Sequence, residues 1–456
     1  MINRFGRFGC RQRHPASAQY NCAAMNSTPL LSGLPALPGR GQRIDFSLPA
    51  SSVDAAALAQ LATTDRCLAV ITASAGDAQR LLEEIPWFNS QLRVRLLPDW
   101  ETLPYDHFSP HHDLVSERLA TLWAALQGQV DILLVPASTA VYRLTPSAFL
   151  AAYTFAFKKG DKLDAEKFRA QVTLAGYSHV TQVVSPGEYS IRGGLIDLFP
   201  MGSPLPYRLD LFDDEIESLK AFDVDSQRTL YPVPELCLLP AREFPMDDKG
   251  RTCFRQRFRE IFEGDPAKSG IYKDVSSGIA PAGIEYYLPL FFDETATLFD
   301  YLPEDAVLVT HGDVPGAIAN FWRDTRSRYD LMQGEKSRPL LPANELFLSD
   351  ENFFIAAKGY GRLHLAAGDS PLAGKLPNVA VDRRSEQPLA ALQSFLDTFA
   401  GRVLLLAESA GRRETLAAML AEHNMRPEAC SDLQGFLASD AKLALTVAPL
   451  QTGFTL

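Results

Sequence analysis

The chain has 456 residues, of which 46% are hydrophobic and 22% are charged, and its formal net charge at pH 7 is −11. This length predicts about two to four domains, and no apolar run approaches the roughly 20 residues of a membrane span. The acidic balance argues against a broad DNA-binding surface, although a local basic strip would remain compatible with it.

The cysteines carry no motif. They are scattered and lack CxxC spacing, a pattern that predicts reduced thiols in a cytoplasmic, reducing compartment rather than disulfides or a zinc site. The six residues are Cys10, Cys22, Cys67, Cys237, Cys253 and Cys430.

The amino-terminal segment differs in composition from the rest of the chain. It carries Arg4, Arg7, Arg11 and Arg13, whereas the first acidic residue is Asp45. This composition mimics an organellar transit peptide. We expect residues 1–40 to be disordered, and translation starting at Met25 would give a more usual amino terminus.

Strand and helix patterns alternate from Cys67 onward. Short apolar runs suited to buried strands stand at Cys67–Thr72, Val94–Leu97 and Ile132–Pro136. Helical spacing of apolar residues predicts helices at Ala78–Ile85 and Val115–Leu126. This alternation predicts a parallel sheet in an α/β domain.

An ATPase would need a phosphate-binding loop after the first of these strands. Such a loop has the pattern GxxxxGK[ST], because backbone N–H groups and a Lys hold the phosphates. The run after the strand is instead TASAGD, which has no Lys and ends at Asp77. The only Gly-Lys pair, Gly374-Lys375, is followed by Leu376, and Gly368 is one residue too far away. The sequence therefore predicts no Walker A motif and no ATP binding.

A histidine-rich turn is the nearest candidate for a metal site. It contains His107, His111, His112 and Asp113, around a Ser-Pro turn. The turn lacks sulfur ligands, and no second cluster stands at metal-ligand spacing. We interpret it as a polar loop that leads into a helix.

The segment from Gly187 to Thr229 predicts two successive β-hairpins. Gly193-Gly194 and Asp213-Asp214 are residue pairs typical of tight turns. The four strands that flank them are expected at Glu188–Arg192, Leu195–Phe199, Tyr207–Phe212 and Glu215–Phe222.

The third of these strands has two different faces, because side chains alternate along a strand. Every second residue from Tyr207 is apolar, and the opposite face carries Arg208, Asp210 and Phe212. On the pattern alone we favour an ordinary amphipathic strand whose Phe is covered by a neighbouring helix. The alternative is a protein-binding patch, in which an aromatic residue and an Arg are the typical anchors.

The remainder of the chain divides into three parts. Residues 243–328 are rich in Phe, Tyr and Arg, which predicts a helical region with an aromatic core and solvated basic faces; Arg255–Glu260 could alternatively touch nucleic acid. The Pro- and Ser-containing stretch Ser337–Pro377 suggests a linker. Val403–Ala407 then leads through Ser-Ala-Gly into the predicted helix Arg412–His423, which repeats the pattern after Cys67 and predicts another α/β domain.

Several long motifs resemble a known family. The hairpin segment resembles the UvrA-binding domain shared by the excision-repair protein UvrB and the bacterial transcription-repair coupling factors. DWETLPYDHFSPHHDLVSERLATL (Asp99–Leu122), PAGIEYYLPLFF (Pro281–Phe292) and RPLLP (Arg338–Pro342) resemble the coupling factors more closely than UvrB. The resemblance covers the chain from about Arg43 to its end.

The resemblance implies a multidomain α/β fold: a degenerate RecA/UvrB-like domain with an inserted small α+β UvrA-binding domain, followed by a further α/β domain. The expected parts are a disordered extension (1–40), the degenerate RecA-like domain (41–151), the UvrA-binding domain (152–238), a region like UvrB domain 1b (239–345), a linker (346–376) and a small α/β domain, intact or truncated (377–456).

The resemblance also implies a non-catalytic module that recruits UvrA to stalled RNA polymerase for transcription-coupled nucleotide excision repair. Three positions match the family's UvrA contact, and four acidic positions would support it by setting register and rejecting wrong partners. The contact positions are Arg192, Arg208 and Phe212, and the supporting positions are Asp210, Asp213, Asp214 and Glu215.

The family continues with an RNA-polymerase-binding module and an ATP-driven DNA translocase. Neither follows here, so no catalytic residue, cofactor or metal is expected in this chain; ATP, Mg²⁺, RNA polymerase and duplex DNA would belong to the missing parts. The abrupt end at Gly453–Leu456 favours an amino-terminal piece over a natural truncation. The alternatives are a DNA-binding UvrB-like repair module and an active ATPase or helicase domain.

Overall fold

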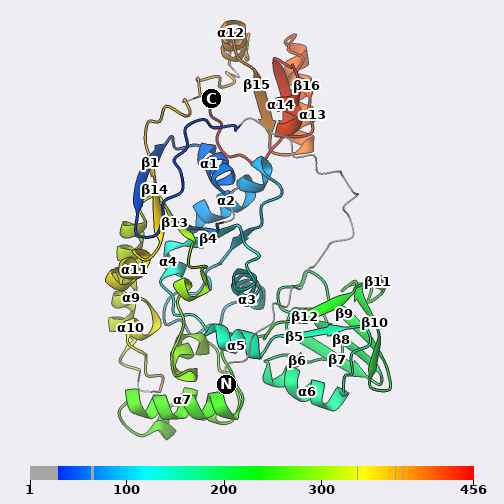
Figure 1. Ribbon diagram of the computed structural model, residues 1–456, viewed down its shortest axis with the longest axis vertical. Coiled ribbons are helices and arrows are strands. Elements are labelled where there is room, and N and C mark those ends of the chain that lie inside the picture. The colour runs from blue at the N-terminus through cyan, green and yellow to red at the C-terminus, as the bar shows by residue number, and fades with distance from the viewer. Residues whose placement is uncertain (1–28, 63–65, 336, 375, 383) are drawn as a thin grey trace.

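A computed structural model describes residues 29–456, except 63–65, 336, 375 and 383 (Figure 1). In this part of the chain the strands form four sheets: a six-stranded parallel sheet, a second six-stranded sheet of hairpins, a two-stranded sheet and a three-stranded sheet. The predicted multidomain α/β architecture is confirmed. The expected disorder of residues 1–28 lies outside the described residues.

The first six-stranded sheet is parallel throughout. Three of its strands lie where the apolar runs predicted them. Of the other three, one precedes these runs in the sequence and two follow the hairpin region. In spatial order the strands are β1 (Arg43–Leu48), β14 (Gly361–Ala367), β13 (Val307–His311), β2 (Leu68–Thr72), β4 (Ile132–Pro136) and β3 (Val94–Leu96).

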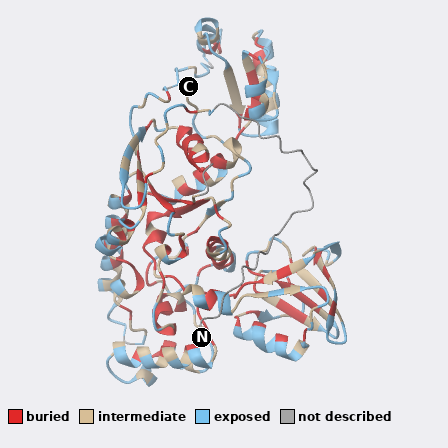
Figure 2. Ribbon diagram, in the orientation of Figure 1, coloured by how far each residue is buried: buried red, intermediate tan, exposed pale blue. Residues whose placement is uncertain are grey.

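The central strands are buried on both faces, which explains their continuous apolar sequences. In β2, Ala69 and Ile71 pack into one hydrophobic cluster, whereas Leu68 and Val70 pack into another on the opposite face. All five residues of β2 and of β4 are buried, as Figure 2 shows for the centre of the molecule. Helices must therefore cover both faces of this sheet.

The helices around the sheet include both predicted ones. Ala78–Ile85 lies inside α2 and Val115–Leu126 lies inside α3, so these predictions are confirmed. The α-helices are α1 (Val53–Leu61), α2 (Ala75–Phe88), α3 (His112–Leu126), α4 (Ala137–Ala140), α5 (Ser147–Ala152), α7 (Asp248–Ile261), α8 (Gly270–Ser276), α9 (Val314–Met332), α10 (Ala343–Leu346) and α11 (Asp350–Ala357), and the 3₁₀ helices are η1 (Pro266–Lys268), η2 (Ile284–Phe291) and η3 (Leu298–Tyr301).

The region after residue 243 has the expected aromatic core. The rings of Phe244 and Phe291 stack with centroids 4.7 Å apart, and Phe254 lies 4.9 Å from Phe291. The basic run Arg255–Glu260 lies on α7, where Phe258 is buried and the other side chains of the run are half-buried or exposed. The run is thus one amphipathic face of a peripheral helix.

Two segments differ from their expected disorder or linker character. Leu31, expected in a disordered extension, is 2% exposed, and its N–H and C=O both bond the Gln60 side chain. Residues 346–376, expected as a linker, contain α11 and β14, and β14 lies between β13 and β1. Polar residues such as Arg362 and His364 hide this strand from an apolar-run search because one of its faces is partly exposed.

The hairpin region forms the second six-stranded sheet, and this sheet contains both predicted hairpins. Helix α6 (Ala165–Leu174) and a two-stranded sheet of β5 (Phe155–Lys158) and β12 (Glu235–Leu238) belong to the same region. In spatial order its strands are β11 (Thr229–Pro232), β10 (Glu215–Phe222), β9 (Tyr207–Phe212), β8 (Leu195–Phe199), β7 (Glu188–Arg192) and β6 (Ser178–His179).

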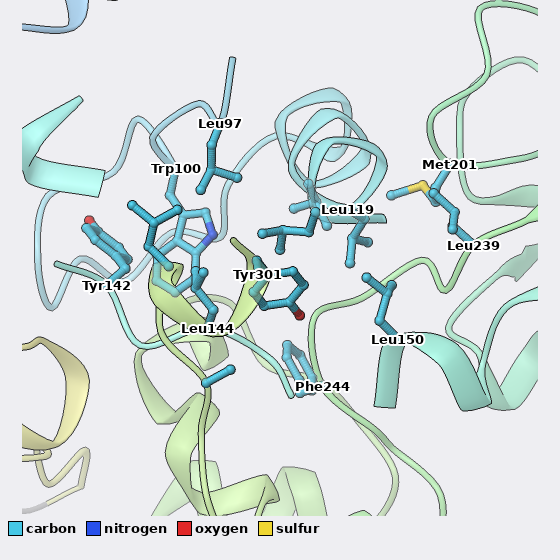
Figure 3. Packing of buried hydrophobic residues seen from close by; sticks show 14 of the residues in the cluster. Leu97, Trp100, Leu119, Tyr142, Leu144, Leu150, Met201, Leu239, Phe244 and Tyr301 are labelled. Atoms are coloured by element: carbon cyan, nitrogen blue, oxygen red, sulfur yellow. The ribbon is translucent and has the colours of Figure 1, made fainter. Parts of the chain in front are cut away.

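This hairpin domain packs against α3 of the first domain. The Gly202 N–H donates to Ser116 Oγ at 2.6 Å, and a Cβ at Gly202 would stand 2.7 Å from the Ala120 Cβ. Met201 and Leu239 approach Leu119 in the same apolar cluster (Figure 3). Gly202 also has φ +78°, so both its backbone conformation and the close approach require glycine.

A buried ion pair lies beneath this junction. Arg118 Nε donates to Glu243 Oε1 at 2.6 Å, and the side chains are 0% and 2% exposed. Arg118 also donates to the Pro98 carbonyl and lies over the Trp100 ring, 5.2 Å from its centroid. One nitrogen of Arg118 and one oxygen of Glu243 have no hydrogen-bond partner in the part of the chain that the structure describes. The pair links α3 to the segment that follows the hairpin domain.

The last described region repeats the strand-to-helix connection found after β2. Ser74 and Ser409 both cap a helix that is separated from a five-residue strand by two residues, and each accepts an N–H from the residue three positions ahead. The elements of this region are α12 (Ala390–Thr398), β15 (Val403–Ala407), α13 (Ala410–Glu422), β16 (Glu428–Ala429), α14 (Leu433–Ala438) and β17 (Leu443–Val447), with strand order β15-β17-β16.

In the described part of the chain, no helix is both long enough and apolar enough to cross a bilayer. Cys67, Cys253 and Cys430 are free thiols, and burial raises the pKa of Cys67 to about 12.

Removing one partner of the buried ion pair should be costly. We expect Arg118→Met to destabilise the first domain by about 3–5 kcal/mol, because it leaves the Glu243 carboxylate buried and unpaired. Urea unfolding followed by tryptophan fluorescence measures this change, since the four tryptophans, Trp87, Trp100, Trp123 and Trp322, all lie outside the hairpin domain. The double variant Arg118→Met/Glu243→Leu should recover most of the loss; a double variant as unstable as the single one would contradict this account.

The Glu285 carboxyl should make stability depend on pH. Burial, with repulsion from Glu243 as a smaller cause, raises the pKa of Glu285 to about 7, and the hydrogen bond from Ser109 opposes this only in part. The ordinary value is about 4.3. Between these two values the folded chain binds more protons than the unfolded chain, so the free energy of unfolding falls as pH rises through this window.

Glu285→Gln removes this pH-dependent destabilisation. We expect the melting temperature of the variant, relative to the unmodified chain, to rise between pH 5 and pH 8. Exposed Glu217→Gln controls for the loss of one surface charge. A difference between Glu285→Gln and the unmodified chain that stays constant over this range would contradict the raised pKa.

Candidate partner-binding face

Strand register brings the predicted site residues onto one face of the hairpin sheet. Asp197 pairs with Arg208, and Leu195 pairs with both Arg192 and Asp210 on its two sides. Because side chains alternate, these residues share the face opposite the apolar cluster that contains Leu209. The predicted site residues, which come from two separate hairpins, thus form one continuous surface.

The turns fix this register. Gly193 has φ +61°, and a Cβ on Gly194 would lie 2.8 Å from the Leu211 carbonyl oxygen. The Leu211 N–H in turn donates to the Gly194 carbonyl at 2.7 Å. Asp213 also has positive φ, at +53°, as the first residue of the other turn. Glycine at 194 therefore lets the first turn approach the third strand.

A buried carboxylate organises the centre of the face. Asp197 is 1% exposed, and Arg208 binds it through two N–H···O bonds of 2.7 and 2.9 Å. Arg192 Nη2 donates to the same carboxylate at 2.5 Å. Bidentate Arg–carboxylate pairs are strong and directional. Two of the three predicted contact residues therefore converge on one acid.

Arg208 is held by more than this pair. Its guanidinium lies over the Phe222 ring at 4.8 Å from the centroid and donates to the Gln227 carbonyl at 3.3 Å. The hydrogen bonds with Asp197 raise the pKa of Arg208. Only 17% of its side chain is exposed, compared with 54% for Arg192. Arg208 is thus mainly a structural residue, and Arg192 is mainly a surface residue.

Asp210 is also paired within the domain. Ser218 and Lys220 donate to it at 2.5 and 2.9 Å. Although partial burial raises the pKa of Asp210, these two hydrogen bonds hold it below the ordinary value. The carboxylate therefore stays ionised and neutralises Lys220.

Phe212 is uncovered. It is 72% exposed, so the interpretation of a Phe hidden under a neighbouring helix is wrong. Phe212 lies at the end of β9 that adjoins the Gly193-Gly194 turn, on the same face of the sheet as Arg192. An exposed aromatic ring on one face with a half-exposed arginine is typical of a protein-binding anchor.

The three remaining acidic residues lie at the tip of the second hairpin. Asp213, Asp214 and Glu215 are exposed. The Asp214 carbonyl accepts the Leu163 N–H at 2.6 Å, and its carboxylate pairs with Lys162 at 3.2 Å. The acidic tip is therefore tied to the loop that precedes α6.

Sequence reasoning missed Asp197, the residue at the centre of the face. Its signal was a charged residue in the middle of an otherwise apolar strand, LIDLF. Pairing across the Gly193-Gly194 turn places Asp197 opposite Ser190, but its meeting with Arg208 depends on the loop between β8 and β9. The length of that loop does not reveal which residues of β8 and β9 lie opposite each other.

The histidine-rich turn and the missing phosphate loop have structural explanations. His111 accepts the Asp113 N–H and caps α3, and His107 lies 3.6 Å from Glu335. Among the described residues no group of His, Cys, Asp and Glu is arranged to hold a metal. After β2, only Ala73 and Ser74 separate the strand from α2, and Ser74 caps the helix through the Asp77 N–H.

A charged network lies close to the connection between β2 and α2. Arg80 binds Asp54 at 2.6 Å and Glu84 at 2.7 Å, and His311 Nε2 lies 2.8 Å from Asp54. Burial raises the pKa of Asp54, but the hydrogen bonds with His311 and Arg80 outweigh burial and hold it below the ordinary value. Side chains of β13, α1 and α2 thus pair with one another at the ends of β2 and β13.

Comparison with known proteins agrees with these features. Residues 155–244, which include the whole candidate face, match the UvrB interaction domain, and residues 395–456 match the D3 domain of MFD. The molecule is therefore a multidomain α/β protein that carries a UvrB interaction domain and a D3 domain.

Named relatives extend this similarity over most of the chain. The transcription-repair-coupling factor of Escherichia coli K12 is 44% identical over 387 residues, which are 83% of this chain and 33% of the relative. That of Haemophilus influenzae Rd is 40% identical over 437 residues, 92% of this chain and 37% of the relative. That of Myxococcus xanthus is 30% identical over 272 residues, 57% of this chain and 23% of the relative.

The chain corresponds to the amino-terminal region of the transcription-repair-coupling factors, as its resemblance indicated. It spans about a third of the length of the first two relatives.

The two arginines on the face should differ in their effect on stability. We expect Arg208→Ala to destabilise the hairpin domain by about 2–4 kcal/mol, because Asp197 would stay buried with one partner lost. Arg192→Ala, the matched control, should cost about 1 kcal/mol or less, because its side chain is half exposed. Hydrogen exchange of backbone amides in β8–β10 measures both; equal protection in the two variants would contradict the structural role of Arg208.

Proposed function

We propose that this chain is a non-catalytic, UvrB-like module that recruits UvrA to stalled RNA polymerase during transcription-coupled nucleotide excision repair. The observation that carries the proposal is the exposed Phe212 on the same sheet face as the half-exposed Arg192, within a segment that matches the UvrB interaction domain. The similarity to transcription-repair-coupling factors supports the link with transcription.

The proposed interface divides labour among the face residues. Phe212 would enter an apolar pocket of UvrA, and Arg192 would use its remaining donors on a UvrA carboxylate. Arg208 would act mainly by holding Asp197, and through it Arg192, in place. The acidic tip of Asp213, Asp214 and Glu215 would repel partners of like charge and so contribute selectivity more than affinity.

The short connection after β2 supports the absence of nucleotide chemistry. A phosphate-binding loop needs several backbone N–H groups that point at the phosphates. Here Ser74 already takes the Asp77 N–H, and the Asp77 carboxylate would repel a phosphate. We therefore propose that ATP, Mg²⁺, RNA polymerase and duplex DNA are bound by other parts of a full-length protein.

Substitutions on the face should weaken UvrA binding without unfolding the domain. In titrations against purified UvrA, Phe212→Ala and Arg192→Ala should each cost about 2 kcal/mol, or roughly thirtyfold in Kd, if they are hot spots. Leu230→Ala is the matched control, because Leu230 is an exposed apolar residue of the edge strand β11 in the same sheet.

The same titration separates the alternatives. UvrB in place of UvrA tests the other partner that the domain's family name suggests, and duplex DNA at several salt concentrations tests the DNA-binding alternative. Unchanged UvrA affinity in Phe212→Ala would refute this interface. Thermal stabilisation of the chain by ATP would contradict the non-catalytic assignment.

A further inference from the structure

A second site lies on the parallel sheet, away from the hairpin domain. A cavity of about 430 Å³ lies over β1, β14 and β13 and is bounded by α11 and the start of α9. Figure 1 places these elements along one side of the molecule. Its volume falls within the range of small-molecule pockets.

The floor of the cavity carries a row of basic groups. Arg43 of β1 pairs in register with Arg362 of β14, and both line the cavity. Neighbouring strands lie about 4.8 Å apart, and alternate residues share a face. His364, two residues after Arg362, therefore faces the same space and lines it too. It bonds Thr310 of β13 at 2.9 Å.

Of the two arginines, Arg362 has no counter-ion among the described residues. Arg43 binds Asp45 at 2.7 and 3.0 Å. Arg362 instead reaches only the Gly41 carbonyl, at 3.5 Å, and its Nε is buried without a hydrogen-bond partner. No carboxylate of the described residues forms an ion pair with it. A partly buried guanidinium in this state gains free energy from an anion that supplies the missing hydrogen bond.

The wall beside Arg362 is apolar. Phe353, Phe354 and Ala357 of α11 line the cavity, and α11 ends four residues before the start of β14. The acidic lining residue, Asp313, caps α9 through the Gly316 N–H and follows the end of β13. Leu308, the partner of Arg362, is the second residue of β13, whereas Asp313 lies beyond the last one, His311. Arg362 therefore lies toward the amino end of β13 and Asp313 beyond its carboxyl end.

We propose that this cavity binds a small organic anion, a carboxylate or a phosphate monoester on an apolar body about the size of one aromatic ring. The anion contacts Arg362 and Arg43, and the apolar body lies against Phe354. This site is separate from the UvrA-binding face and does not depend on it.

Titration calorimetry on the whole chain tests the site with four probes. Phenyl phosphate and phenylacetate carry both features, inorganic phosphate carries only the anion, and phenol carries only the ring. We expect saturable binding of phenyl phosphate, phenylacetate or both, and the stronger of the two identifies the headgroup. Inorganic phosphate and phenol should bind more weakly than that probe.

Variants of the lining locate the binding. Arg362→Gln should weaken the preferred probe at least about tenfold, the usual effect of losing a charged hydrogen bond. Ala366→Phe should fill the cavity and abolish binding without changing charge, whereas Arg323→Gln, on an exposed part of α9, should have no effect. Absence of saturable binding of both phenyl probes at millimolar concentration, or equal affinity in Arg362→Gln, would overturn the proposal.

Discussion

The Arg118–Glu243 ion pair joins the parts of this molecule that the chain separates. The hairpin domain lies between α3, which carries Arg118, and the segment of Glu243, so the two ends of that excursion meet at one buried contact. Burying two charges is expensive, and each partner here keeps one polar atom without a hydrogen bond. Such a pair adds little net stability, but separating its partners would leave buried charges unpaired. It therefore disfavours arrangements in which α3 and the segment of Glu243 come apart at the base of the hairpin domain.

The hairpin domain uses a similar device on its surface. Asp197 is buried beneath two arginines, one of which is nearly covered while the other is half exposed. A buried acid fixes the position of an exposed guanidinium, so Arg192 loses little conformational freedom when it meets a partner. This arrangement explains why residues on a binding surface can also support the fold. A loss of binding after substitution of Arg208 could therefore come from a lost contact or from a loosened sheet. Substitution of the exposed Phe212 tests the surface contact alone.

The sequence was informative where local patterns decide structure. Strands β2, β3 and β4, helices α2 and α3 and both hairpins are visible because period and turn residues are local signals. Strand β14 was missed because Arg362 and His364 interrupt its apolar residues on the face that lines the cavity, and Leu31 was missed because a short segment gains its order from distant partners. Phe212 was expected under a helix, and nothing in its own strand indicates otherwise. Asp197 required the register between β8 and β9, which depends on how an irregular loop folds.

The parallel sheet also explains why domain limits drawn along the sequence fail for this chain. Its central strand β2 pairs with β4 on one side and with β13 on the other, and 170 residues separate the end of β4 from the start of β13. The buried Glu84 carboxylate of α2 accepts the Gln451 N–H, so the last described segment also contacts the first domain. Such non-local contacts form only after large loops are closed, which costs conformational entropy. A fragment that stopped at residue 151 would lack β13, β14 and the Glu243 partner of Arg118, and would expose one edge of β2. The first domain is therefore a discontinuous unit, and the candidate face is an insertion within it.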